Sequence, residues 1–156
     1  MVHLAVETLI QAPINLCFDL ARDMRVHAES MANTREQVLR CPESGLLELG
    51  DEVEFEAVHF GIRQRLTSKI VEYDRPKLFV DQMVTGAFKS LRHEHRFRID
   101  GEFTVMTDVV ELAAPFGLLG RLAEAAFLNR YMHKLLSERG AQLRTLAELK
   151  YAESNS

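Results

Sequence analysis

The sequence predicts an α+β fold in which a curved antiparallel sheet of about six or seven strands wraps around one long C-terminal helix. Apolar and polar residues alternate in segment after segment before residue 113, which is typical of strands. Residues 115–148 instead repeat apolar side chains at three- and four-residue steps, which indicates an amphipathic helix. Because short turns separate most of the strands, we expect consecutive strands to pair as an antiparallel meander that curls around the helix.

The N-terminal part predicts one strand followed by two short helices. Residues 2–10 alternate as a strand does, and Ala12-Pro13 ends that pattern. Proline suits the first turn of a helix, so a short helix is expected from Ile14 to about Arg22. Asp23 is a typical N-cap residue and predicts a second short helix directly after the first.

The middle of the chain predicts a brief strand at residues 36–41 and then a series of long strands. Turn signals at Phe60-Gly61, Thr85-Gly86 and Asp100-Gly101 divide this series, and Asp-Gly favours a two-residue hairpin turn. For the strand at 77–84, either Phe79, Asp81 and Met83 or the alternate set faces inward, and the pattern does not decide between them. The long strands are expected at residues 51–60, 62–73, 77–84, 88–99 and 102–113.

The long helix is expected over Pro115–Glu148, with most of its charged residues, including Arg139, away from the apolar stripe. Phe116–Gly120 contains two glycines beside bulky apolar residues and is predicted to form a gate at the mouth of a pocket. Residues 1–150 are expected to form a single domain, and residues 151–156 a frayed tail. The predicted stripe consists of Leu119, Leu122, Ala123, Ala126, Phe127, Tyr131, Leu135 and Leu136.

Composition argues against several classes of function. A formal net charge of −4 disfavours nucleic acid as a partner, because phosphate binding needs a net basic face. No apolar run reaches the roughly 20 residues of a membrane-spanning helix, and the N-terminus lacks the features of a signal peptide. We therefore expect a cytoplasmic protein with no membrane span and no nucleic-acid partner.

Two histidines on the strand at 88–99 are the most suggestive polar residues. Alternation places His93 and His95 on the same face as Leu91, Phe97 and Ile99, where a polar group needs a partner or a ligand. If Asp100-Gly101 forms the turn, counting back places Phe97 opposite Thr104, His95 opposite Met106 and His93 opposite Asp108.

The predicted His93–Asp108 pair leaves three interpretations open. It can be a structural pair that satisfies itself, a group that orients a ligand, or a general base and acid. A zinc site formed by His93, His95 and His59 is a further alternative, since histidines two apart on one strand face can share a metal. No cysteine pair supports that alternative, so we predict neither a metal nor a cofactor. His59 itself is either a hydrogen-bonded strand residue or part of the cavity mouth.

Five segments in sequence order resemble one bacterial ligand-binding branch of the SRPBCC superfamily, which includes START domains, Bet v 1 and polyketide cyclase/dehydrase-like proteins. The resemblance implies a helix-grip fold with a cavity between the sheet and the long helix for a hydrophobic or amphipathic small molecule. It does not imply one reaction. The segments are APINLCFDLARD (12–23), GDEVEFEAVHFGI (50–62), RPKLFVDQMVTGAF (75–88), HEHRF (93–97) and TDVVELAAPFGLLG (107–120).

The function predicted from these observations is the binding of a small hydrophobic, aromatic or acyl molecule. One alternative is an enzyme of the polyketide cyclase or dehydratase type that uses His93 and Asp108 for catalysis. Another is an interaction protein without a ligand, for example a homodimer. The residues predicted to contact the ligand are Phe55, His59, His93, His95, Phe97, Met106 and Asp108 on the sheet and Phe127 and Tyr131 on the helix.

Overall fold

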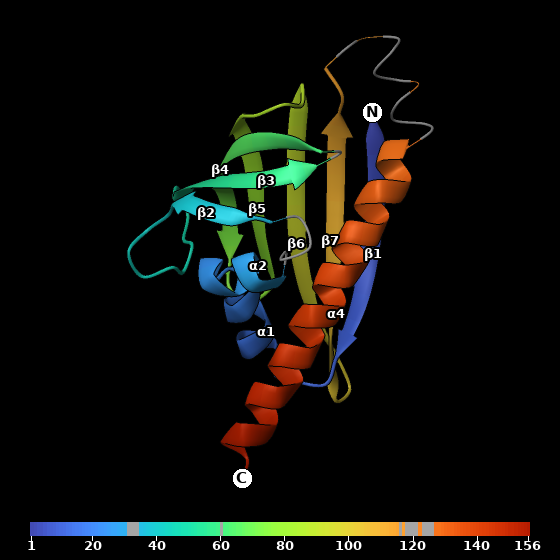
Figure 1. Ribbon diagram of the computed structural model, residues 1–156. Helices are drawn as coiled ribbons and strands as arrows, with labels where there is room; N and C mark the ends of the chain where they lie inside the picture. The colour runs from blue at the N-terminus through green and yellow to red at the C-terminus, as the bar shows by residue number, and fades with distance from the viewer. Residues whose placement is uncertain (31–34, 60, 116, 118–121, 123–126) are drawn as a thin grey trace.

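The computed structural model describes residues 1–30, 35–59, 61–115, 117, 122 and 127–156. The predicted α+β fold is confirmed, with one strand, two short helices, a run of strands and a long C-terminal helix in that order (Figure 1). The elements are β1 (Val2–Ile10), α1 (Ile14–Ala21), α2 (Met24–Ser30), β2 (Gln37–Arg40), β3 (Glu52–His59), β4 (Ile62–Asp74), β5 (Leu78–Thr85), β6 (Ser90–Asp100), β7 (Phe103–Ala113) and α4 (Asn129–Ser154).

The strands form one antiparallel sheet of seven strands in the order β1-β7-β6-β5-β4-β3-β2. Consecutive strands from β2 to β7 are neighbours, as expected for a meander, and β1 adds to the free edge of β7. The sheet curves strongly, and α4 lies along its concave side next to β1 (Figure 1). None of the helices in the described ranges is long and apolar enough to cross a bilayer.

The two short helices lie at one end of the curved sheet (Figure 1). As predicted, Asp23 caps α2, since its Oδ1 accepts a hydrogen bond from the backbone N–H of Arg25 at 3.0 Å. Asp23 also forms an isolated antiparallel bridge with Leu46, which ties the start of α2 to the segment before β3. These contacts hold the start of α2 in place, and the two short helices cover this end of the sheet.

The long helix α4 differs from the prediction at its C-terminal end. It continues to Ser154, so four residues of the predicted frayed tail are helical, although all are exposed. Residues 149–154 contain neither glycine nor proline, and nothing in their sequence ends a helix. At the other end, the predicted helix start falls partly on residues 116, 118–121 and 123–126, which lie outside the described residues. The predicted gate at Phe116–Gly120 lies there too, apart from Gly117.

The hairpin between β6 and β7 corrects the predicted register by two residues. Asp100 remains in the strand and pairs with Phe103, so Gly101 and Glu102 form the turn. Gly101 adopts a φ of +61°, which glycine tolerates without steric cost. A shift of two changes every partner but keeps each side chain on its face. His95 consequently lies opposite Asp108, His93 opposite Val110, and Phe97 opposite Met106.

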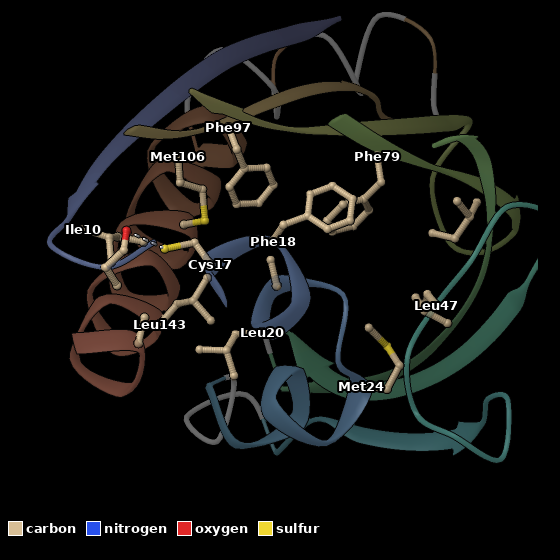
Figure 2. Packing of buried hydrophobic residues seen from close by; sticks show 14 of the residues in the cluster. Ile10, Cys17, Phe18, Leu20, Met24, Leu47, Phe79, Phe97, Met106 and Leu143 are labelled. Atoms are coloured by element: carbon tan, nitrogen blue, oxygen red, sulfur yellow. Dashed lines mark hydrogen bonds between the residues drawn. The ribbon is translucent and has the colours of Figure 1, made fainter. Parts of the chain in front are cut away.

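The inner face is packed solidly at the end covered by α1. Phe18 of α1 makes edge-on contacts with Phe79 and Phe97, with ring centroids 5.3 Å and 5.4 Å apart (Figure 2). Met106 belongs to the same cluster, and Phe97 and Met106 are almost fully buried. Phe79 also settles the face of β5, because it and Asp81 lie on the inner side.

We expect the substitution Gly140→Ala to destabilise the fold. An added Cβ at this position of α4 would lie 2.3 Å from Oγ1 of Thr8 on β1, so the helix would have to move away from the sheet. Such overpacking costs about 1–3 kcal/mol, which exceeds the gain of about 1 kcal/mol from replacing a helical glycine with alanine. Urea denaturation measures the change in the free energy of unfolding.

The double variant Gly140→Ala, Thr8→Ala provides the control. Removing the hydroxyl and the methyl group of Thr8 leaves its Cβ 3.5 Å from the new methyl group, which is an ordinary contact. We therefore expect the double variant to be more stable than Gly140→Ala. A neutral or stabilising effect of Gly140→Ala alone would contradict the close packing of α4 on β1.

Candidate functional site

A cavity of about 510 Å³ lies between the concave face of the sheet and α4. Strands β3 to β6 form one wall, and α4 forms the opposite wall with Leu135 and Leu136. The lining is mostly apolar, and the volume falls within the range of about 300–1,000 Å³ that is usual for small-molecule sites. The solid cluster around Phe18 therefore fills only part of the space between sheet and helix.

Four polar side chains from three adjacent strands meet in the sheet wall of this cavity. Nε2 of His93 lies 2.7 Å from Oδ1 of Asp108, and Nε2 of His95 lies 2.7 Å from Oδ2 of Asp81. Nδ1 of His95 is 3.4 Å from Oδ1 of Asp108, and the two imidazole rings stack with centroids 3.8 Å apart. His95 thus lies between two carboxylates, and we call these four residues the His–Asp cluster.

Burial and pairing drive the pKa values of the two histidines in opposite directions. Burial alone would lower the pKa of His95, but the carboxylates of Asp108 and Asp81 outweigh it and raise this pKa above its ordinary value. Burial, followed by the charge of His95, lowers the pKa of His93 despite its bond to Asp108. His95 therefore binds its proton more tightly than His93, and at a pH between the two pKa values His95 is the imidazolium whereas His93 is neutral.

The two carboxylates hold their charge although Asp108 is almost fully buried and the side chain of Asp81 is only 21% exposed. Burial on its own would raise the pKa of Asp81 and of Asp108, but the histidine hydrogen bonds more than compensate and lower both pKa values. Since ionised Asp108 can only accept, the neutral ring of His93 donates from Nε2. Its Nδ1 is consequently left with a lone pair that can accept a hydrogen bond or a proton.

Arg139 of α4 lines the cavity beside the His–Asp cluster. Its Nη1 lies 3.9 Å from Oδ1 of Asp108, and its side chain is only 8% exposed. The prediction that Arg139 lies away from the buried stripe is wrong. It lies three residues after Leu136 and four before Leu143, both of which are buried, so this helical spacing places it on the inner face.

A second polar contact joins the sheet to the helix. His59 of β3 and Tyr131 of α4 are hydrogen-bonded through Nδ1 and the hydroxyl, and their rings meet edge to face with centroids 5.6 Å apart. Burial lowers the pKa of His59 and raises the pKa of Tyr131, so the hydroxyl keeps its proton and donates to a neutral imidazole. Both side chains line the cavity.

The structure does not assemble the zinc site of His59, His93 and His95, because His59 is paired with Tyr131. A different trio, Asp81, His93 and His95, offers ligand atoms within 4.8 Å of one another. In that trio each Nε2 already donates to a carboxylate, and the guanidinium of Arg139 adds a positive charge beside it. These features fit an internally neutralised ionic cluster better than a site for a cation.

The structure brings together most of the residues predicted to contact a ligand. Phe55, His59, His93, His95 and Tyr131 line the cavity, and Asp108 lies behind His93. Whether they contact a ligand stays a prediction.

Three of the predicted residues lie elsewhere. Phe97 and Met106 belong to the solid core, because α1 covers that end of the inner face. Phe127 is 69% exposed and points away from the cavity lining.

Among the polar residues that line the cavity without having been predicted as site residues are Asp81, Arg139 and Ser68 of β4. Ser68 is almost fully buried and lines the cavity. Its alternation with Leu66 and Ile70 on β4 was an available signal for an inward face, as was the helical spacing of Arg139. The position of Asp81 had no such signal, because an irregular register between Ile70 and Glu72 precedes it in the sheet.

We expect nuclear magnetic resonance titration to show that His95 loses its proton at a higher pH than His93. Asp81→Asn should lower the pKa of His95, because the amide cannot stabilise the imidazolium as the carboxylate does. The stability gained from this pair is fully present below the unfolded histidine pKa of about 6.5 and is lost as pH rises through the raised folded value. It also weakens below about pH 4, where Asp81 becomes protonated in the unfolded chain.

Urea denaturation across this pH range gives the second measurement. The difference in unfolding free energy between the wild type and Asp81→Asn should be largest at mildly acidic pH and should decrease toward alkaline pH. A difference that does not vary with pH, or a pKa of His95 below that of His93, would contradict the assigned charges.

Comparisons with known proteins agree with this architecture. Residues 1–148 match the family model described as "Polyketide cyclase / dehydrase and lipid transport". No curated protein matches the sequence.

Solved structures show the same fold at low sequence identity. TTHA0849 from Thermus thermophilus is 16% identical, with a TM-score of 0.74 over 94% of this chain and 99% of that one. CV1439 from Chromobacterium violaceum is 12% identical, with a TM-score of 0.73 over 94% and 96% of the two chains.

A plant protein of the Bet v 1 type shares this fold as well. Major latex-like protein 151 from Panax ginseng is 17% identical, with a TM-score of 0.66 over 94% of this chain and 97% of that one. At these identities the likeness shows the fold alone. The family match extends over almost the whole chain, and the curved seven-stranded sheet around a C-terminal helix is the helix-grip fold. The chain therefore belongs to the polyketide cyclase/dehydrase and lipid transport family of the SRPBCC superfamily.

Proposed function

We propose that this protein binds a small, largely apolar molecule in the cavity between its sheet and α4. The observation that carries the proposal is a mostly apolar cavity of about 510 Å³ whose wall contains the His–Asp cluster. Apolar walls supply most of the affinity in such sites, and a few polar groups set the orientation of the ligand. The family description, which includes lipid transport, supports the same class of ligand.

The cavity also weighs against an interaction protein that uses the fold without a ligand. Such a protein would gain stability from a filled interior, because unfilled apolar volume forfeits packing contacts. In this protein Ala57 of β3 and Leu135 of α4 line an open volume that larger side chains at these positions would fill. The open interior fits a binding site better than a purely structural core. Homodimer formation remains a separate prediction.

A second candidate function is general acid–base catalysis on a bound carbonyl compound. The specific observation is the 2.7 Å contact of Nε2 of His93 with Asp108, which orients a neutral imidazole and leaves Nδ1 as a base. The guanidinium of Arg139 lines the same cavity and could stabilise an enolate oxygen. Binding without chemistry needs fewer conditions, so it is the leading proposal.

We expect the neutral probe N-phenyl-1-naphthylamine to show saturable fluorescence enhancement with the wild-type protein. Ala57 lines the cavity and is 6% exposed, so Ala57→Leu should occupy volume that the probe needs and weaken binding by about tenfold or more. A fluorescence titration measures both dissociation constants.

Ala5→Leu is the matched control, because Ala5 is an exposed residue of β1 that does not line the cavity. Its affinity for the probe should equal that of the wild type. Absence of saturable binding to the wild type, or equal binding by Ala57→Leu and Ala5→Leu, would refute the proposed site.

For the second candidate, we expect the protein to accelerate deuterium exchange at the α-carbon of 2-tetralone in D₂O. Nδ1 of His93 would take the α-proton to leave an enolate, exchange this proton for a deuteron from D₂O, and then return the deuteron to the same carbon. His93→Gln keeps an N–H for Asp108 but removes the base, so the exchange rate should fall by about 100-fold or more. Nuclear magnetic resonance follows the loss of the α-proton signal.

Binding of N-phenyl-1-naphthylamine is the control for this experiment. It should be unchanged in His93→Gln if the residue acts as a base, and weakened if it only maintains the shape of the cavity. Equal exchange rates with and without the wild-type protein would rule out this reaction.

A further inference from the structure

Arg139 is a buried cation with one carboxylate neighbour in the described part of the protein. Its side chain is 8% exposed, and its closest carboxylate contact is at 3.9 Å, beyond hydrogen-bond distance. That single carboxylate neighbour among the described residues leaves most of the five N–H donors of this guanidinium open. Since Arg139 lines the cavity, the acceptor that it lacks can come from the cavity.

Ser68 presents a second unused polar group to the same space. It is 1% exposed, it lines the cavity, and its Oγ has no hydrogen-bond partner among the described residues. Ser68 pairs with Met83 across β4 and β5, whereas Asp81 pairs with Ile70. Ser68 and Asp81 are therefore diagonal neighbours on the inner face, which places Ser68 beside the His–Asp cluster.

We propose that the cavity selects ligands that carry a carboxylate, with Arg139 as the principal donor to that group and Ser68 as a second donor. This inference rests on the proposed binding function and names the polar group of the ligand. The planar fork of an arginine matches the two oxygens of a carboxylate, whereas a single alcohol oxygen can use only part of it.

The two aspartates near this position do not make it a negatively charged site. Asp81 and Asp108 each accept a hydrogen bond from a histidine, and the imidazolium of His95 lies between them. Two carboxylates, one imidazolium and the guanidinium of Arg139 carry a net charge of zero. An incoming carboxylate therefore meets donors that are locally unpaired, within a cluster that is neutral as a whole.

The test compares decanoate with 1-decanol, which have the same chain length and differ in the charged group. Each ligand displaces N-phenyl-1-naphthylamine from the wild-type protein at about pH 7, where decanoate is ionised. We expect decanoate to bind about tenfold or more tightly than the alcohol. Arg139→Met keeps an apolar stem of similar length without the charge and should weaken the binding of decanoate far more than that of 1-decanol, which removes most of this preference. Ser68→Ala should reduce the preference by a smaller factor.

Arg144→Met is the matched control, because Arg144 is an exposed arginine of the same helix that does not line the cavity. It should keep the full preference for decanoate. Equal binding of decanoate and 1-decanol to the wild type would overturn the inference without needing any variant, and would leave the proposed function intact. An undiminished preference in Arg139→Met would overturn it as well. If neither ligand nor the probe binds, the proposed function and this inference both fail.

Discussion

The position of two ionised carboxylates beneath α4, one almost fully buried and one partly buried, is the constraint on which the rest of the site depends. An isolated buried charge is costly, and Asp81 and Asp108 are tolerated because His95 and His93 hydrogen-bond to them. These bonds join β5, β6 and β7, and Arg139 extends the network to α4. The strand register and the position of the helix are therefore coupled to a polar cluster rather than to apolar packing alone. Groups held by rigid strands in this way are suited to orienting a ligand.

The same sheet face serves two purposes along its length. Where α1 covers it, Phe18 fills the space with edge-on contacts to Phe79 and Phe97, as a packed core requires (Figure 2). Beyond this cluster the face remains open toward α4, and Phe79 bridges the two regions by stacking on His95 with ring centroids 4.1 Å apart. The short helices thus decide which inward residues belong to the core and which face the cavity. Strand periodicity alone cannot make that distinction, since it predicts only that Phe97 and His93 share a face.

Periodicity and turn signals predicted the order of the elements and the inward face of β6, because both depend on local chemistry. The register of β6 and β7 could not be read in the same way. Either Asp100 or Gly101 can occupy the first position of the turn, and the backbone places Gly101 there. Asp81 was ambiguous because the irregular pairing around Glu72 interrupts a simple count along β4 and β5. Arg139 is a different case, since its spacing from Leu136 and Leu143 was correct and only its charge argued against a buried position.

The polar part of the cavity wall also limits how the two functional proposals can be combined. Catalysis on a carbonyl compound would use Arg139 to hold the developing enolate oxygen and Nδ1 of His93 to take the proton. A ligand carboxylate on Arg139 would occupy the donors that the enolate needs. One ligand group cannot fill both roles at once, so a carboxylate-selective cavity favours a carrier or sensor over a catalyst acting next to Arg139. A fold shared at 12–17% identity does not distinguish a carrier from a catalyst. The identity of the ligand group that binds Arg139 does distinguish them.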